Sequence, residues 1–175
     1  MESDLRYPIG KFTYAGPPAP AERGRMIHEI AETPELLKNA VSGIPESCLD
    51  TPYRAGGWSV RQIVHHVADS HLNSYVRTKL ALTEEVPVIK PYDQDLWAAL
   101  PDSRQVSVEV SLLLLDALHR RWVTLLRSMA EEQFKRTLRH PEMGVLALER
   151  IVALYAWHGK HHTAQIIGTR QRNGW

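Results

Sequence analysis

The chain has 175 residues, with 21 Lys or Arg against 20 Asp or Glu, so its formal charge is close to neutral. A chain of this length can close one hydrophobic core, and we expect a single domain over 1–175. The balanced charge gives no reason to expect a nucleic-acid partner, which clustered Lys and Arg would indicate, and the single cysteine excludes an intramolecular disulfide.

The N-terminal twelve residues, MESDLRYPIGKF, lack the apolar core of a signal peptide. No apolar run approaches the length of a membrane span. We therefore expect a cytoplasmic protein with no membrane partner.

The first twenty residues (1–20) are rich in Pro and Gly and predict an extended N-terminal arm. Its aromatic and apolar side chains could lie across the core or across a partner subunit. A helical pattern follows up to Val41, and Pro34 marks a kink or a restart within it. Cys48, in the loop that comes next, is interpreted as a small, partly buried hydrophobe in preference to a reactive thiol.

The second predicted helix begins at a capping box, because Ser59 is followed three residues later by Gln62. More than twenty residues without Pro or Gly come after it, so we expect a helix over 59–84. The connection 86–103 contains three prolines and exceeds the roughly two to eight residues usual between helices of a bundle. It predicts a crossover.

A third helix is expected over 106–129 and a last helix over 146–171, with a loop over 134–145 between them. No segment alternates as a strand does. These four helices predict an all-α fold, a four-helix bundle with a long crossover connection. The apolar residues at helical intervals in the third helix are Val110, Leu113, Leu114, Ala117, Leu118, Trp122, Leu125 and Leu126.

The last helix contains the segment WHGKHHTAQI, with three histidines in five positions. His158 and His162 are four residues apart and share the face that also carries Ile166, so both are expected to point inward. His161 lies at the edge of that face, and Lys160 faces away.

The second helix carries the adjacent pair His65 and His66, of which the helical wheel places His66 on the inward face. Two histidines at i, i+4 and a third from a facing helix can share one ion and leave a fourth position open. The alternative is that all three are hydrogen-bonded core residues. We favour a metal site at His66, His158 and His162, because three inward histidines converge.

The pattern is not that of a zinc peptidase, because HGKHH has no Glu after its first His. Asp69 could orient an imidazole, although we favour an ion pair with Lys or Arg at the helix edge. Arg54 could reach an anionic substrate or could simply be solvated. Trp58 and Trp157 are interpreted first as packing residues.

Two segments, 49–77 and 154–166, resemble the corresponding segments of the DinB/YfiT-like superfamily, in particular its YfiT branch of metal-dependent hydrolases. The RYPIG arm, the PYRAGGW loop and the terminal GW are also similar to that branch. The resemblance implies a homodimer and one Zn²⁺ or Ni²⁺ per chain, held by His66, His158 and His162. YfiT-like sequences tend to carry a further His where this chain has Lys160, a position that faces outward on the wheel.

The leading functional hypothesis is a metal-dependent hydrolase that activates water against a small-molecule substrate. A related branch of the superfamily implies an alternative, the transfer of a low-molecular-weight thiol such as bacillithiol, because a coordinated thiol ionises. A third hypothesis is a non-enzymatic, metal-binding stress protein. The sequence selects neither the substrate nor a general base, and imidazole ligands suit several divalent metals.

Overall fold

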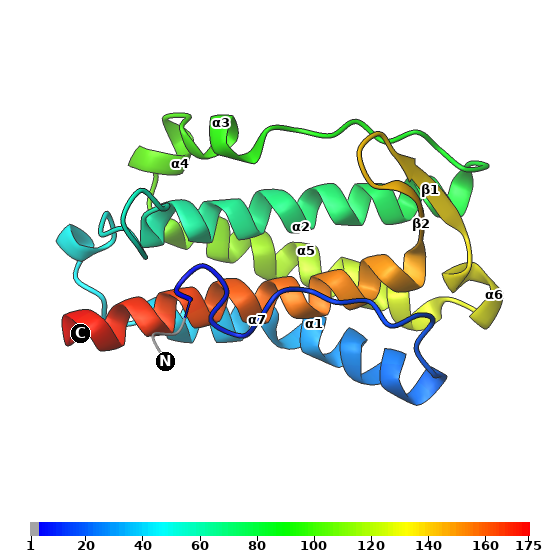
Figure 1. Ribbon diagram of the computed structural model, residues 1–175, viewed down its shortest axis with the longest axis horizontal. Coiled ribbons are helices and arrows are strands. Elements are labelled where there is room, and N and C mark those ends of the chain that lie inside the picture. The colour runs from blue at the N-terminus through cyan, green and yellow to red at the C-terminus, as the bar shows by residue number, and fades with distance from the viewer. Residues whose placement is uncertain (1–3) are drawn as a thin grey trace.

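The computed structural model describes residues 4–175, so residues 1–3 of the predicted arm and domain lie outside the described residues. Four long helices pack side by side, each against two neighbours, in the order α1, α5, α2, α7 around the bundle (Figure 1). The predicted all-α four-helix bundle is therefore confirmed. The long helices are α1 (Pro20–Val41), α2 (Val60–Thr83), α5 (Val108–Ser128) and α7 (Leu148–Asn173).

Helix α1 begins with Pro20 in its first turn, where proline is favoured, and it runs without a break through Pro34. Of the two expected outcomes, the restart is absent, because one helix covers Pro20–Val41. Its contact with α7 is very close at Gly159, where an added Cβ would lie 2.5 Å from the hydroxyl oxygen of Thr33. A glycine at this position is what allows α1 and α7 to approach each other.

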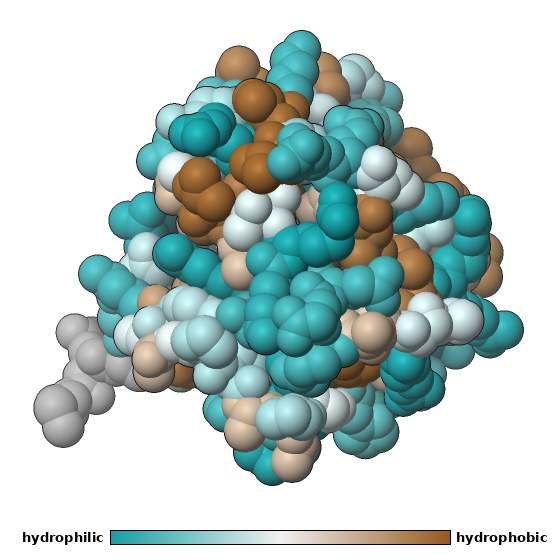
Figure 2. Space-filling model, turned by 90° about the vertical axis from the view of Figure 1, so that its right-hand side faces the viewer, coloured by the Kyte–Doolittle hydropathy of each residue, from teal (hydrophilic) through white to brown (hydrophobic). Residues whose placement is uncertain are grey.

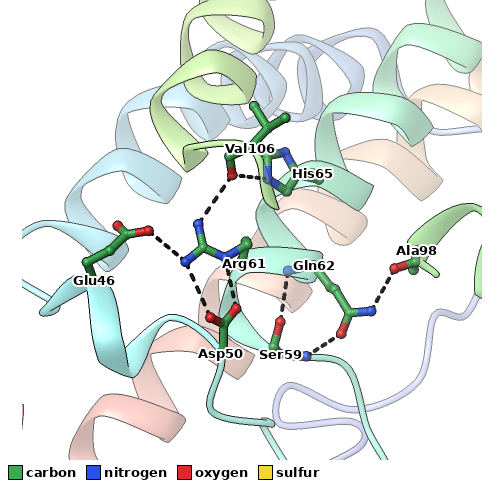
Figure 3. Close-up of polar contacts among 8 residues, drawn as sticks. All are labelled: Glu46, Asp50, Ser59, Arg61, Gln62, His65, Ala98 and Val106. Atoms are coloured by element: carbon green, nitrogen blue, oxygen red, sulfur yellow. Dashed lines mark hydrogen bonds and ion pairs between the residues drawn. The ribbon is translucent and has the colours of Figure 1, made fainter. Parts of the chain in front are cut away.

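Helix α2 begins at the predicted capping box (Figure 3). The backbone N–H of Gln62 donates to Ser59 Oγ at 3.2 Å, and the backbone N–H of Ser59 donates to Gln62 Oε1 at 2.9 Å. These two bonds satisfy N–H groups that otherwise have no acceptor at a helix start.

The predicted crossover runs back along α2, so α2 and α5 are parallel (Figure 1). Two short helices within it, α3 (Gln94–Ala98) and α4 (Asp102–Gln105), were not predicted. Helix α3 is capped by Asp93, whose Oδ1 accepts from the N–H groups of Asp95 and Leu96 at 3.0 Å. Gln62 Nε2 donates to the carbonyl of Ala98 at 2.7 Å (Figure 3), which ties α3 to the start of α2.

The loop expected over 134–145 is largely an antiparallel hairpin of β1 (Thr137–His140) and β2 (Gly144–Ala147). The prediction was wrong here because each strand has only four residues, too few for alternation to stand out. Two further short elements are the 3₁₀ turn η1 (Glu46–Cys48) and α6 (Glu131–Phe134). Figure 2 views the end of the molecule that carries the hairpin and α6, and it shows apolar surface among polar side chains. The exposed apolar residues of the hairpin and the adjoining crossover are Val86, Val88, Met143 and Val145.

The apolar residues predicted at helical intervals in α5 are buried only in part: Leu118, Trp122 and Leu126 lie in the core. Val110, Leu113 and Leu114 are exposed, and Leu113 reaches 71%. The buried face of α5 consists of Val108, Leu112, Leu115, Leu118, His119, Trp122, Val123 and Leu126. The sequence pattern misled because α5 is apolar on more than one side.

The core consists of two apolar clusters, one toward each end of the bundle. Representative members of the first are Ile30, Tyr75, Leu118, Trp122 and Tyr155, and of the second Leu37, Val67, Leu115 and Ile166. Three histidines lie near the boundary between the clusters: His71 on α2 and His158 on α7 lie between them in sequence, and His119 directly follows Leu118, where the first cluster begins on α5. A polar layer thus divides the apolar interior.

The N-terminal arm lies along α7 of its own chain (Figure 1). Phe12 packs on Trp157 with ring centroids 5.9 Å apart, and the guanidinium of Arg150 lies over the ring of Tyr14. Of the two placements left open by the sequence, the structure shows the one on the chain itself. Within residues 4–175, no helix combines the length and apolarity needed to cross a membrane.

Candidate metal centre

The three predicted histidines meet between α2 and α7. His66, His158 and His162 each offer one ring nitrogen, and the three nitrogens lie within 4.8 Å of one another. His158 and His162 are one helical turn apart on α7, with ring centroids separated by 4.5 Å. We call these three residues the tripod.

Hydrogen bonds fix which nitrogen of His162 faces the other two rings. Its Nδ1 lies 2.8 Å from Oε1 of Gln165, and Gln165 Nε2 donates to the backbone carbonyl of Arg6 at 3.1 Å. Because the amide oxygen can only accept, Nδ1 of His162 is the donor. The neutral ring then has its lone pair on Nε2.

The separation of the tripod nitrogens fits a shared divalent cation. Nε2 of His66 and Nε2 of His158 are 3.4 Å apart. This exceeds the usual hydrogen-bond range of about 2.7–3.2 Å. It matches the roughly 3.4 Å expected between two nitrogens that each lie about 2.1 Å from one tetrahedral zinc ion. The donor set of three imidazoles also suits zinc and nickel.

The environment keeps the tripod imidazoles in the uncharged form that can bind a metal. Burial is the main cause that lowers the pKa of His66, His158 and His162 well below the usual value. The neighbouring imidazoles lower the pKa values further, because a second positive charge there would be repelled.

A cavity of about 460 Å³ opens directly onto the tripod. The N-terminal arm, the loop before α2, helix α3 and helix α7 all contribute to its wall. Its lining includes the side chains of Arg6, Arg54, Trp58, Asp95 and His161.

The loop before α2 is shaped so that two of its side chains reach this cavity. The backbone N–H of Tyr53 donates to the carbonyl of Trp58 at 3.0 Å, which closes a tight turn. A Cβ at Gly57 would lie 2.6 Å from the Tyr53 ring, so only glycine fits there without a shift. Arg54 Nε donates to the Tyr53 hydroxyl at 2.9 Å, which holds the guanidinium on the cavity wall.

The two tryptophans interpreted as packing residues both line the cavity. The Trp58 ring lies 4.4 Å from that of His66, and its Nε1 donates to Asp95 at 3.0 Å. Trp157 stacks on His161, with ring centroids 4.4 Å apart. His161, expected at the edge of the inward face, is buried, and burial lowers its pKa to about 4.

Other candidates from the sequence lie away from this arrangement. Lys160 faces outward, as expected, and pairs with Glu29 at 2.9 Å. Cys48 is half-buried against the second apolar cluster, as predicted. Asp69 makes neither the favoured ion pair nor a bond to an imidazole among residues 4–175. Burial and the charge of Asp102 raise its pKa to about 6.

Two histidines beneath the tripod were missed. His71 on α2 and His119 on α5 are fully buried, and their facing ring nitrogens are 2.9 Å apart. His119 could have been found from the sequence, because it lies beside Leu118 and four residues after Leu115 on the apolar face of α5. His71 gave a weaker signal, because it follows His66 by five residues and does not share its helical stripe.

Comparisons with known proteins agree with this geometry. The DinB superfamily matches residues 29–166. A relative from Bacillus cereus (strain B4264), named "Putative metal-dependent hydrolase", is 53% identical over 173 residues, covering 99% of each chain. A relative of the same name from Bacillus mycoides (strain KBAB4) is 52% identical over 172 residues, covering 98% of this chain and 99% of the other.

A solved structure is also similar over almost the whole chain. It is YfiT from Bacillus subtilis, described as "a probable metal-dependent hydrolase with an unusual four-helix bundle topology". The TM-score is 0.95 at 47% identity, with 98% of each chain covered. The chain therefore belongs to the DinB superfamily and shares the bundle topology of YfiT.

Proposed function

We propose that this chain is a metal-dependent hydrolase that holds one divalent cation, Zn²⁺ or Ni²⁺, on His66, His158 and His162. The observation that carries the proposal is the 3.4 Å separation of the two Nε2 atoms of His66 and His158, next to a third imidazole and a cavity. The names of the relatives from Bacillus cereus and Bacillus subtilis support the same function.

A cation on three neutral imidazoles supplies a Lewis acid with an open position, which lowers the pKa of a water molecule or a thiol. The chain itself supplies the surroundings of the substrate. Trp58 offers an aromatic face beside the tripod, and Arg6 and Arg54 offer guanidinium donors on the cavity wall.

The charges around the cavity favour a substrate with an anionic group. Neither Arg6 nor Arg54 is part of an ion pair within the described residues, whereas Asp95, the carboxylate on the wall, accepts from Trp58. The two guanidinium groups and the one carboxylate therefore give the cavity wall a net positive charge. The substrate we propose is a small ester, amide or phosphate compound that carries negative charge.

The first test is the metal content of tag-free protein purified without chelators. About one Zn or Ni per chain is expected, with loss of the metal in His162→Ala. The matched control is His28→Ala, which changes an exposed histidine of α1 and leaves the content unchanged. No metal, and no uptake of added Zn²⁺ or Ni²⁺, would overturn the proposal.

The second test separates the possible reactions. Metal-loaded protein is screened against esters, amides and phosphate compounds, and in parallel against pairs of a thiol and an electrophile. Hydrolysis without a thiol supports the proposal. Turnover only with a thiol would replace it with an S-transferase, and tight metal binding without any turnover would favour the metal-binding stress protein. The homodimer implied by the resemblance stays a prediction for sedimentation to check.

A further inference from the structure

Beneath the tripod, hydrogen bonds connect three imidazoles across all four long helices. His158 Nδ1 on α7 is 3.1 Å from His71 Nε2 on α2, and His71 Nδ1 is 2.9 Å from His119 Nε2 on α5. His119 Nδ1 is 2.7 Å from the backbone carbonyl of Ile30 on α1. We call this series, from Ile30 to His158, the histidine relay.

The relay ends on a carbonyl that the helix itself leaves free. In an α-helix the carbonyl of residue 30 accepts from the N–H of residue 34, but residue 34 is proline and has no N–H. A buried carbonyl without a partner is costly. His119 therefore supplies the donor that Pro34 cannot.

The carbonyl of Ile30 determines the direction of every bond in the relay. A carbonyl oxygen only accepts, so His119 Nδ1 carries its proton and His119 Nε2 accepts. His71 must then donate through Nδ1 and accept at Nε2, and His158 must donate through Nδ1. The opposite direction would place a bare nitrogen of His119 against the Ile30 oxygen at 2.7 Å, where the two lone pairs repel.

The three bonds of the relay use all the ring protons that three neutral imidazoles possess. No proton is left for Nε2 of His158. This is the atom that lies 3.4 Å from Nε2 of His66 in the tripod. The relay thus leaves a lone pair where a cation would bind.

The relay lies in the buried interior of the bundle. The rings of Trp122 and Tyr155 contact His71 edge-on, with centroids at 5.9 Å and 4.9 Å. Both His71 and His119 are essentially without solvent exposure. A charged imidazole is unfavourable in such a buried position, so each ring of the relay carries the one proton that its hydrogen bond uses.

We propose that His71 and His119 are positioning residues that hold His158 with its Nε2 unprotonated and aimed into the tripod. The anchor of this arrangement is the Ile30 carbonyl, which Pro34 frees. The inference rests on the proposed metal site, but the protonation state of His158 can be measured without any metal.

The direct test is a long-range ¹H–¹⁵N NMR spectrum of the histidine side chains in metal-free protein. We expect His119, His71 and His158 to be neutral and protonated at Nδ1. A proton at Nε2 of His158 would overturn the proposal. This measurement needs no substitution, so it does not depend on whether a variant folds.

A pair of variants at one position tests the effect on metal binding. In His71→Gln, the amide oxygen can accept from His158 and the amide nitrogen can donate to His119, so affinity stays close to that of the wild type. In His71→Leu, His158 loses its acceptor, and Zn²⁺ affinity falls by about 10–100-fold, as for other partners of metal-bound histidines. Competition with a chromogenic chelator measures both.

The matched control is His65→Leu, which removes a buried histidine of the same helix outside the relay. His65 bonds to Ser111 Oγ and to the carbonyl of Val106 on the α5 side. This variant should lose stability without losing Zn²⁺ affinity. Equal affinities of His71→Leu and His71→Gln would overturn the relay. If the wild type bound no cation at all, the proposed function would fail, and the NMR spectra would still decide the state of His158.

Discussion

Helix α2 carries two buried polar groups that differ in how fully they are bonded. The first is the guanidinium of Arg61, which is 5% exposed (Figure 3). Its Nε donates to Asp50 at 2.8 Å, its Nη2 to Glu46 at 2.7 Å, and its Nη1 to the carbonyl of Val106 at 3.2 Å. Every nitrogen of this side chain has a partner within the protein.

The second group is the tripod, whose His66 lies about one turn and a half further along the same helix, opposite His158 and His162 of α7. Here the Nδ1 atoms of His158 and His162 are hydrogen-bonded, to His71 and to Gln165. Their Nε2 atoms face His66 and the cavity. A saturated polar cluster stabilises the fold and has nothing left to offer a ligand. An unsaturated cluster of lone pairs beside a cavity can bind a cation.

The largest effect should appear on acidification of metal-free protein, in the histidine relay that lies beneath the tripod. Above pH 6.5 the buried histidines are neutral in both the folded and the unfolded chain. Below pH 6.5 the unfolded chain takes up protons, whereas folded His119 does so only near its pKa of about 4. The unfolding free energy should therefore fall between pH 6.5 and 4, by about 3 kcal/mol for His119 alone.

Urea unfolding at pH 7, 6 and 5 measures this fall. The variant His119→Gln removes one titrating group, so its stability should depend less steeply on pH. Constant stability of the wild type between pH 7 and 5 would contradict the prediction.

A substitution in the tripod should separate binding from stability. Losing a residue that hydrogen-bonds to a metal ligand lowers metal affinity by up to roughly 100-fold. In His162→Ala a ligand itself is lost, so Zn²⁺ affinity should fall by more than that. The unfolding free energy of the metal-free protein should fall by only about 1 kcal/mol, since one neutral hydrogen bond disappears. Chelator competition and urea unfolding measure the two effects, and a large loss of metal-free stability would show that the tripod is structural.

The opposite result is expected for the saturated cluster. In Arg61→Ala the unfolding free energy should fall by about 2–3 kcal/mol, because the loop before α2 and the start of α5 lose a shared donor. Zn²⁺ affinity should change by less than about threefold. The control Arg120→Ala breaks an exposed pair with Asp116 and should cost about 0.5 kcal/mol or less. A parallel loss of affinity in Arg61→Ala would mean that the clusters are coupled.

The smallest effect is expected at the far end of the histidine relay. Pro34→Ala gives residue 34 an N–H that can donate to the Ile30 carbonyl. A carbonyl oxygen has two lone pairs, so His119 can keep its bond. Zn²⁺ affinity should fall by less than about tenfold. A loss as large as that of His162→Ala would show that Pro34 acts in another way.

The sequence was sufficient for features that depend on local spacing. The i, i+4 spacing of His158 and His162 and the capping box at Ser59 are visible within a few residues. The crossover was also predictable, because the length and prolines of 86–103 exclude a tight turn.

Features that depend on the register between helices could not be predicted in the same way. His71 meets His119 only because the crossover sets α2 and α5 parallel, with neighbouring turns aligned. Pro34 frees a carbonyl only because α1 continues past it, and a restart of the helix at Pro34 was equally compatible with the sequence. Arg6 reaches the cavity because the arm folds back over α7, which no local pattern specifies.

The span of the histidine relay has a consequence for the motions of the bundle. Helix α1 gives no nitrogen to the tripod, yet its Ile30 carbonyl is the acceptor on which the relay depends. If α1 swings away, His119 loses its partner and the cation-bound state becomes less favourable. Cation binding and the docking of α1 are therefore linked, so a bound cation should slow amide hydrogen exchange in a helix that never contacts it.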